Sequence, residues 1–114
     1  SRTDVLLFGI GTAMRMADQR HIADDVRKKL VDNHAVGEAL GQYCDMDGKL
    51  IYSTNNIGLS LPDVAKVPNV IAVAGGQEKA SAIIGVMRAC QKGILIIDEQ
   101  AAEGMRQLLQ ISAL

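Results

Sequence analysis

The chain has 114 residues, 48% of them hydrophobic, with 12 basic and 13 acidic side chains and a formal net charge of −1. This length suits one domain, and the near-neutral charge gives no electrostatic basis for binding nucleic acid or an anionic membrane. No apolar run approaches the ~20 residues of a membrane span, no signal peptide is recognisable, and Cys44 and Cys90 lack CxxC spacing, so a cytoplasmic protein with free thiols is predicted.

Three apolar runs lack alternating polar positions, and each is followed by helix-compatible sequence: 5–8, 70–73 and 94–97. Continuous β-branched runs are typical of strands buried on both faces of a parallel sheet. Apolar periodicity and capping acids predict four helices, at about 12–19, 24–31, 77–90 and 99–109. The pattern predicts an α/β fold: a Rossmann-like parallel sheet with helices on both faces.

Residues 36–60 have a sequence pattern that differs from that of these strand–helix units. Asp47-Gly48 lies between two strand-like stretches, and Asp-Gly favours a type I′ turn, in which both central residues need positive φ. A β-hairpin is therefore predicted, with strands at about 39–45 and 49–53. Pro62 lies near a predicted single helical turn, and Pro68 ends the segment before the next strand.

The first apolar run begins only four residues from the N-terminus, although a strand that is apolar on both faces normally has neighbours on each side. Three parallel strands and a hairpin make a thin sheet. Either another copy covers the exposed faces, or the chain is part of a larger domain. The fragment interpretation is favoured, and a homo-oligomer is compatible with both.

Gly75 and Gly76 end the second apolar run, and Lys79 follows on the first turn of the predicted helix. Glycines let a backbone approach an anion closely, and a helix N-terminus offers unpaired N–H groups. A phosphate site is one interpretation; a simple strand-to-helix turn with a solvated lysine is the other. The GxxxxGK[ST] pattern of a nucleotide P-loop is absent.

Other polar residues also have two interpretations. Glu38 could accept hydrogen bonds from sugar hydroxyls or be an exposed strand charge, and Arg20 could bind a phosphate or lie on the surface. Asp98 could cap a helix or take part in a site, and the cap is favoured. No His pair has ligand spacing, and Gly9-Ile10-Gly11 lacks the third glycine of a dinucleotide fingerprint, so neither a metal nor a cofactor is predicted.

Four segments together resemble the C-terminal portion of the SorC family of sugar-responsive bacterial transcriptional regulators, from Asp4 to about Leu109. They are "DVLLFGIGTAMRMADQR", "AVGEALGQYCDMDGKLIYS", "VPNVIAVAGGQEKASAIIGVM" and "ILIIDEQAAEGMRQLL". The resemblance implies an effector-binding domain with a fold similar to glucosamine-6-phosphate deaminase and ribose-5-phosphate isomerase, and no catalysis. It implies that residues 1–114 are the second half of that domain, and that a missing helix-turn-helix domain binds operator DNA.

The effector implied by the resemblance is a phosphorylated sugar or glycolytic intermediate. Gly76, Gln77 and Lys79 then lie at a phosphate-binding loop, and Glu38 matches a carboxylate that contacts the sugar. Arg20, or Gln19 beside it, matches an arginine of the phosphate-contacting region. The alternative is a sugar-phosphate isomerase or deaminase, in which Glu38 or Asp98 would have to act as general base.

Overall fold

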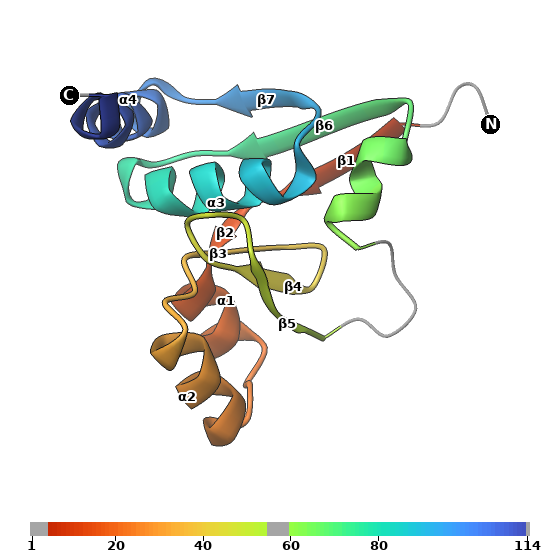
Figure 1. The fold of residues 1–114 in the computed structure, drawn as a ribbon, viewed down its shortest axis with the longest axis vertical. Coiled ribbons are helices and arrows are strands. Elements are labelled where there is room, and N and C mark those ends of the chain that lie inside the picture. Colours follow the sequence, from red (N-terminus) through yellow and green to blue (C-terminus); the bar gives the residue numbers. More distant parts are fainter. Residues whose placement is uncertain (1–4, 55–59, 114) are drawn as a thin grey trace.

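The computed structural model describes residues 5–54 and 60–113 and contains two sheets (Figure 1). The first is parallel, with the order β1-β6-β7, and comprises β1 (Val5–Gly9), β6 (Asn69–Ala74) and β7 (Ile94–Ile97). The second is antiparallel, with the order β2-β3-β4-β5, and comprises β2 (Gly11–Thr12), β3 (Gly37–Ala39), β4 (Gln42–Cys44) and β5 (Leu50–Ser53). The chain passes from one sheet to the other at Ile10, whose N–H donates to the Val73 carbonyl at 3.0 Å.

The helices form layers against these sheets (Figure 1). α3 (Ala80–Cys90) lies between the two sheets, beside α4 (Glu99–Ala113) and the short 3-10 helix η1 (Pro62–Lys66). α1 (Ala13–Gln19) and α2 (Asp24–Asp32) pack against the antiparallel sheet in a second, smaller core that contains Leu30 and Tyr43. The α/β class, the parallel sheet and a separate β-hairpin are thus confirmed.

Glycines bring the backbone of α3 unusually close to the antiparallel sheet. A Cβ at Gly37 would lie 2.8 Å from the Ala82 carbonyl oxygen, and one at Gly85 would lie 2.5 Å from the Asp45 carbonyl oxygen. Eight residues of α3 are buried, more than the one apolar stripe that the sequence predicted. The reason is that a second sheet covers the other side of this helix.

The prediction of helices on both faces of the parallel sheet is wrong for the described residues. Leu7 is 64% exposed and Ile94 63%, and the side chains that share their face are exposed too: Val5, Val73 and Ile96. The opposite face packs into the main core through Phe8 and Ala72. α4 follows the last strand but packs against α3, so the described helices all leave this apolar face open.

The Asp47-Gly48 hairpin is confirmed between β4 and β5, but its turn differs from the predicted type. Gly48 has φ +88°, whereas Asp47 is not at positive φ. The Asp45 carboxylate accepts the N–H groups of Asp47 and Lys49 at 3.0 and 2.9 Å and fixes the loop. A second hairpin, β3–β4, turns at Leu40-Gly41 and shortens the first predicted strand.

The predicted helices are present, with shifted ends. α2 begins at Asp24 with Ala23 as its N-cap, so the acids lie in the first turn and do not cap. The third helix opens with a 3-10 turn, η2 (Gln77–Lys79). Both cysteines are free, and burial raises the pKa of Cys44 to about 12 and that of Cys90 to about 11, so both stay protonated thiols at neutral pH.

Candidate functional site

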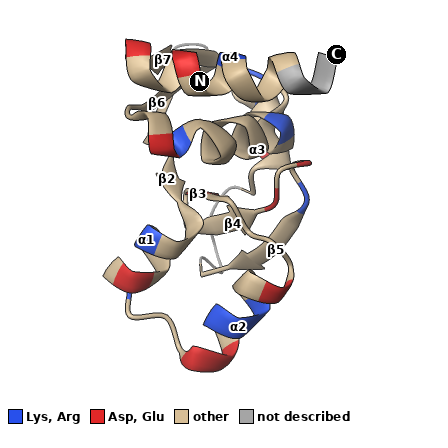
Figure 2. Cartoon of the chain, turned by 90° about the vertical axis from the view of Figure 1, so that its left-hand side faces the viewer, with Lys and Arg blue, Asp and Glu red and all other residues tan. Residues whose placement is uncertain are grey.

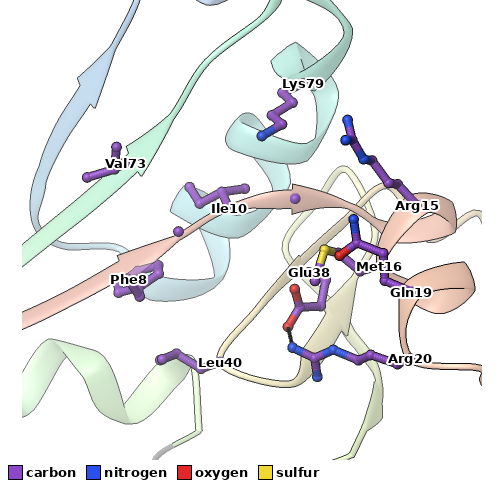
Figure 3. Close-up of a pocket in the computed structure, with 12 residues that line it drawn as sticks. Phe8, Ile10, Arg15, Met16, Gln19, Arg20, Glu38, Leu40, Val73 and Lys79 are labelled. Carbon is purple, nitrogen blue, oxygen red and sulfur yellow. Dashed lines mark ion pairs between the residues drawn. The ribbon is translucent and has the colours of Figure 1, made fainter.

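A cavity of about 520 Å³ opens where the two sheets meet (Figure 3). Its walls come from the β1–β2 junction, α1, β3, the β3–β4 turn, β6 and η2. Four of the residues singled out in the sequence line it or border it together: Gln19, Arg20, Glu38 and Lys79. The remaining lining residues are Phe8, Gly9, Ile10, Gly11, Arg15, Met16, Leu40 and Val73.

An ion pair forms one side of the cavity. Arg20 Nη2 lies 3.0 Å from Glu38 Oε2, and the same carboxylate oxygen accepts the Gly41 N–H at 2.8 Å. The Glu38 side chain is 4% exposed and that of Arg20 is 36% exposed. Glu38 is therefore a buried carboxylate with a cationic partner and an amide donor, and not the exposed strand charge of the alternative interpretation.

The β3–β4 turn places Leu40 at the cavity wall. Leu40 has φ +54° and Gly41 φ +78°, the pair of left-handed conformations that a type I′ hairpin requires. Such a conformation is strained for leucine and persists only when neighbours hold it. Glu38 holds one side of the turn; on the other, Thr54 donates to the Gly41 carbonyl through its N–H and its hydroxyl, and Arg20 Nη1 donates to the Thr54 hydroxyl oxygen at 3.1 Å.

Cations outnumber anions in the cavity. Arg15, Arg20 and Lys79 line it together with one carboxylate, Glu38. Lys79 and Arg15 lie on one side of the strand that crosses the cavity, and the Arg20–Glu38 pair lies on the other (Figure 3). Elsewhere basic and acidic residues are interspersed over the helices (Figure 2), in keeping with the net charge of −1. The cavity is thus a local anion-attracting site on a nearly neutral protein.

The paired glycines take a different place from the one that the sequence suggested. Gly75, Gly76 and Gln77 do not line the cavity. The Gly76 N–H donates to both carboxylate oxygens of Asp98, each at 3.1 Å. A phosphate at this amide would have to displace a carboxylate of the protein itself.

Asp98 caps α4 as predicted. Its Oδ1 accepts the Ala101 N–H at 2.8 Å, three residues into the helix. The hydrogen bonds from Ala101 and then Gly76 hold the pKa of the Asp98 carboxyl below its ordinary value. The carboxylate is therefore ionised at neutral pH and joins the carboxyl ends of two neighbouring strands, β6 and β7.

Sequence reasoning missed Arg15 and Tyr43. Arg15 lies four residues before Gln19, on the same side of α1, and this i, i+4 spacing could have predicted it. Tyr43 pairs with Glu38 across the β3–β4 ladder, and its buried hydroxyl has no hydrogen-bond partner among the described residues. Burial, opposed by the nearby Arg20 charge, raises the pKa of Tyr43. No single-sequence signal marks this tyrosine.

The described ranges 5–54 and 60–113 contain neither a metal site nor a membrane-spanning helix. No group of three or more His, Cys, Asp or Glu side chains is arranged to hold a metal ion there. No helix in these ranges is long and apolar enough to cross a bilayer.

Comparison with known proteins gives the family. Residues 1–107 match the family model "Sugar-bind: Putative sugar-binding domain". The chain is 39% identical over 99 residues to the central glycolytic genes regulator of Bacillus subtilis, which covers 87% of this chain and 29% of the regulator. It is 29% identical over 109 residues to the deoxyribonucleoside regulator of the same species, covering 91% and 35%. The chain therefore spans about a third of these relatives.

Solved structures agree with this assignment. A crystal structure described as "the putative SorC family transcriptional regulator from Enterococcus faecalis" matches with a TM-score of 0.80 and 39% identity, over 88% of this chain and 41% of that one. A transcriptional regulator from Streptococcus pneumoniae matches with a TM-score of 0.79 and 29% identity, over 96% and 43%. The fold and the family model define a sugar-binding domain of the kind found in these transcriptional regulators. The chain belongs to the putative sugar-binding domain family, and it resembles a SorC family regulator. The enzyme alternative is not supported, since the relatives are named as regulators.

Proposed function

We propose that the cavity binds a phosphorylated sugar or glycolytic intermediate as the effector of the regulator. Lys79 binds a phosphate group, and Glu38 accepts hydrogen bonds from sugar hydroxyls. Arg20, with Gln19 beside it, contributes a further polar part of the cavity wall. Gly75, Gly76 and Gln77 form the loop that carries Lys79. No cofactor is required by this proposal.

The observation that carries the proposal is the meeting of Lys79, Arg20 and Glu38 in one cavity, from three elements distant in sequence. A cavity lined by more cationic side chains than carboxylates favours an anionic ligand. A buried carboxylate among them can accept hydrogen bonds from the hydroxyl groups of a sugar. Glu38 Oε2 is occupied by Arg20 and Gly41, whereas Oε1 makes no hydrogen bond within the described part of the chain. The apolar side chains of Phe8, Ile10 and Leu40 give the carbon face of a sugar a surface to pack against.

Binding would regulate by shifting populations. A ligand changes an equilibrium only by its differential affinity for the two states. We propose that the full-length protein is a cytoplasmic homo-oligomer that contacts operator DNA through a region outside this chain. Its effector would favour one quaternary arrangement over another through the contacts of the cavity.

The test is a titration of the full-length protein with fructose 1,6-bisphosphate, fructose 6-phosphate, fructose and inorganic phosphate, followed by calorimetry and thermal shift. A ligand that binds the folded state raises the melting temperature in proportion to RT ln(1 + [L]/Kd). We expect binding by the phosphosugars and none by fructose. Equal binding of fructose and fructose 6-phosphate, or no binding of any, would refute the proposal.

We further propose that residues 1–114 are the C-terminal part of a larger effector-binding domain, whose preceding part covers the open face of β1-β6-β7. Five apolar side chains share this face, and the chain spans less than half of the solved relatives. In the full-length protein, Leu7→Asp would then bury a charge and lower the free energy of unfolding by roughly 3 kcal/mol.

The matched control for Leu7→Asp is Val31→Asp on α2, because Val31 is 54% exposed and lies outside this face. We expect this control to cost less than about 0.5 kcal/mol, as surface substitutions do. Urea denaturation of both variants decides the matter. Equal, small losses would mean that the sheet face stays open in the full-length protein.

A further inference from the structure

Asp98 does not line the cavity, but its carboxylate joins the start of α4 to the Gly75–Gly76 loop. Its carboxylate caps α4 through the Ala101 N–H and holds the Gly76 N–H with both oxygens. Gly76 has φ +97°, a conformation that L side chains rarely adopt, and the Lys79 N–H donates to its carbonyl oxygen at 3.2 Å. One carboxylate therefore fixes the residue from which the turn carrying Lys79 starts.

The surroundings of this loop leave little room for another anion. A Cβ at Gly75 would lie 2.9 Å from Asp98 Oδ2, and one at Gly76 would lie 2.5 Å from Glu78 Oε1. Two carboxylates thus crowd the paired glycines. A phosphate that approached the loop would be repelled by these carboxylates. A phosphate in the cavity would instead meet the ammonium of Lys79, whose half-buried side chain lines the cavity (Figure 3).

We propose that Asp98 is a positioning residue of the effector site: it fixes the Gly75–Gly76 loop so that Lys79 reaches the cavity, and it does not itself contact the ligand. This inference rests on the proposed phosphosugar function. A group held rigidly by a supporting residue binds its ligand more tightly than one left to several rotamers, because less conformational entropy is lost on binding.

The sharpest variant is Asp98→Ser, because serine is as good an N-cap as aspartate but is too short to keep both the Ala101 and the Gly76 contacts. In the full-length protein we expect Asp98→Ser to weaken fructose 1,6-bisphosphate binding about 10-fold. Asp98→Asn keeps the length and one acceptor oxygen, so its affinity should stay within about 3-fold of that of the unchanged protein.

A double-mutant cycle shows whether the effect passes through Lys79. In a Lys79→Met background, Asp98→Ser should weaken binding less than about 2-fold, because the group that it positions is gone. An equal 10-fold loss in both backgrounds would show that Asp98 acts independently of Lys79 and would overturn the inference. No loss from Asp98→Ser in the unchanged background would overturn it too.

The matched control is Asp45→Ser. The Asp45 carboxylate also accepts two backbone N–H groups, in the β4–β5 loop, and it does not line the cavity. Its substitution should lower stability without changing affinity, and a 10-fold loss of affinity here would count against a specific role of Asp98. If the unchanged protein binds no phosphosugar, the proposed function fails and the inference with it. Binding with an additive cycle refutes the inference alone.

Discussion

Lys79→Met should weaken the binding of fructose 1,6-bisphosphate to the full-length protein about 30-fold, equivalent to ~2 kcal/mol. The ammonium lines a cavity in which cations outnumber carboxylates, and Figure 3 shows it directed into that space. A hydrogen bond between charged groups is worth roughly 1.5–3 kcal/mol net, and the methionine keeps the aliphatic part of the side chain while removing the charge. Isothermal titration calorimetry gives both dissociation constants.

The control for this substitution is Lys28→Met, which removes the same charge from α2. Lys28 is 75% exposed, pairs with Asp32 at 2.6 Å and does not line the cavity. Surface pairs of this kind contribute little, so we expect affinity within about 2-fold of that of the unchanged protein. Salt gives a second check, since the affinity of the unchanged protein should fall more steeply with ionic strength than that of Lys79→Met. Equal affinities for Lys79→Met and Lys28→Met would exclude Lys79 from the site.

Periodicity predicted the strands and helices because it reports local burial. The run 70–73 became the central strand β6, and the Asp47-Gly48 turn was placed correctly. The Leu40-Gly41 turn was not predicted, because leucine has no preference for positive φ and is held there by contacts with Glu38 and Thr54. Such contacts join residues far apart in the sequence, and no local pattern contains them.

Contacts between residues far apart in the sequence also limited the prediction of the candidate site. The sequence singled out Glu38 and Lys79, and the fold brings both to one cavity. It assigned the Gly76 amide to a phosphate, although in the structure this amide donates to Asp98, 22 residues later. A Gly-Gly loop before a helix is equally suited to an external anion and to a carboxylate of the chain itself. The topology, which sets β7 beside β6, brings Asp98 to this loop, and no local pattern contains that contact.

Gly85→Ala tests the packing that sets the distance between the two halves of the site. In an isolated helix this change would be favourable by roughly 0.5–1 kcal/mol, because glycine loses more backbone entropy on folding. Here the added methyl would lie 2.5 Å from the Asp45 carbonyl oxygen and 2.9 Å from Val36 Cγ2. The carbonyl is backbone and cannot turn aside as a side chain could, so α3 and the β4–β5 loop must separate.

Overpacking of this kind typically costs 1–3 kcal/mol, so we expect Gly85→Ala to lower the free energy of unfolding by about 2 kcal/mol, measured by urea denaturation. Gly9→Ala is the control, because its added methyl would meet no atom closer than the Val73 carbonyl oxygen at 3.9 Å. If Gly85→Ala stabilises the protein, helix propensity outweighs the contact and the close approach is not rigid. If it destabilises as expected, the separation also moves β3 away from α3. Glu38 would then shift relative to Lys79, and phosphosugar affinity should fall together with stability.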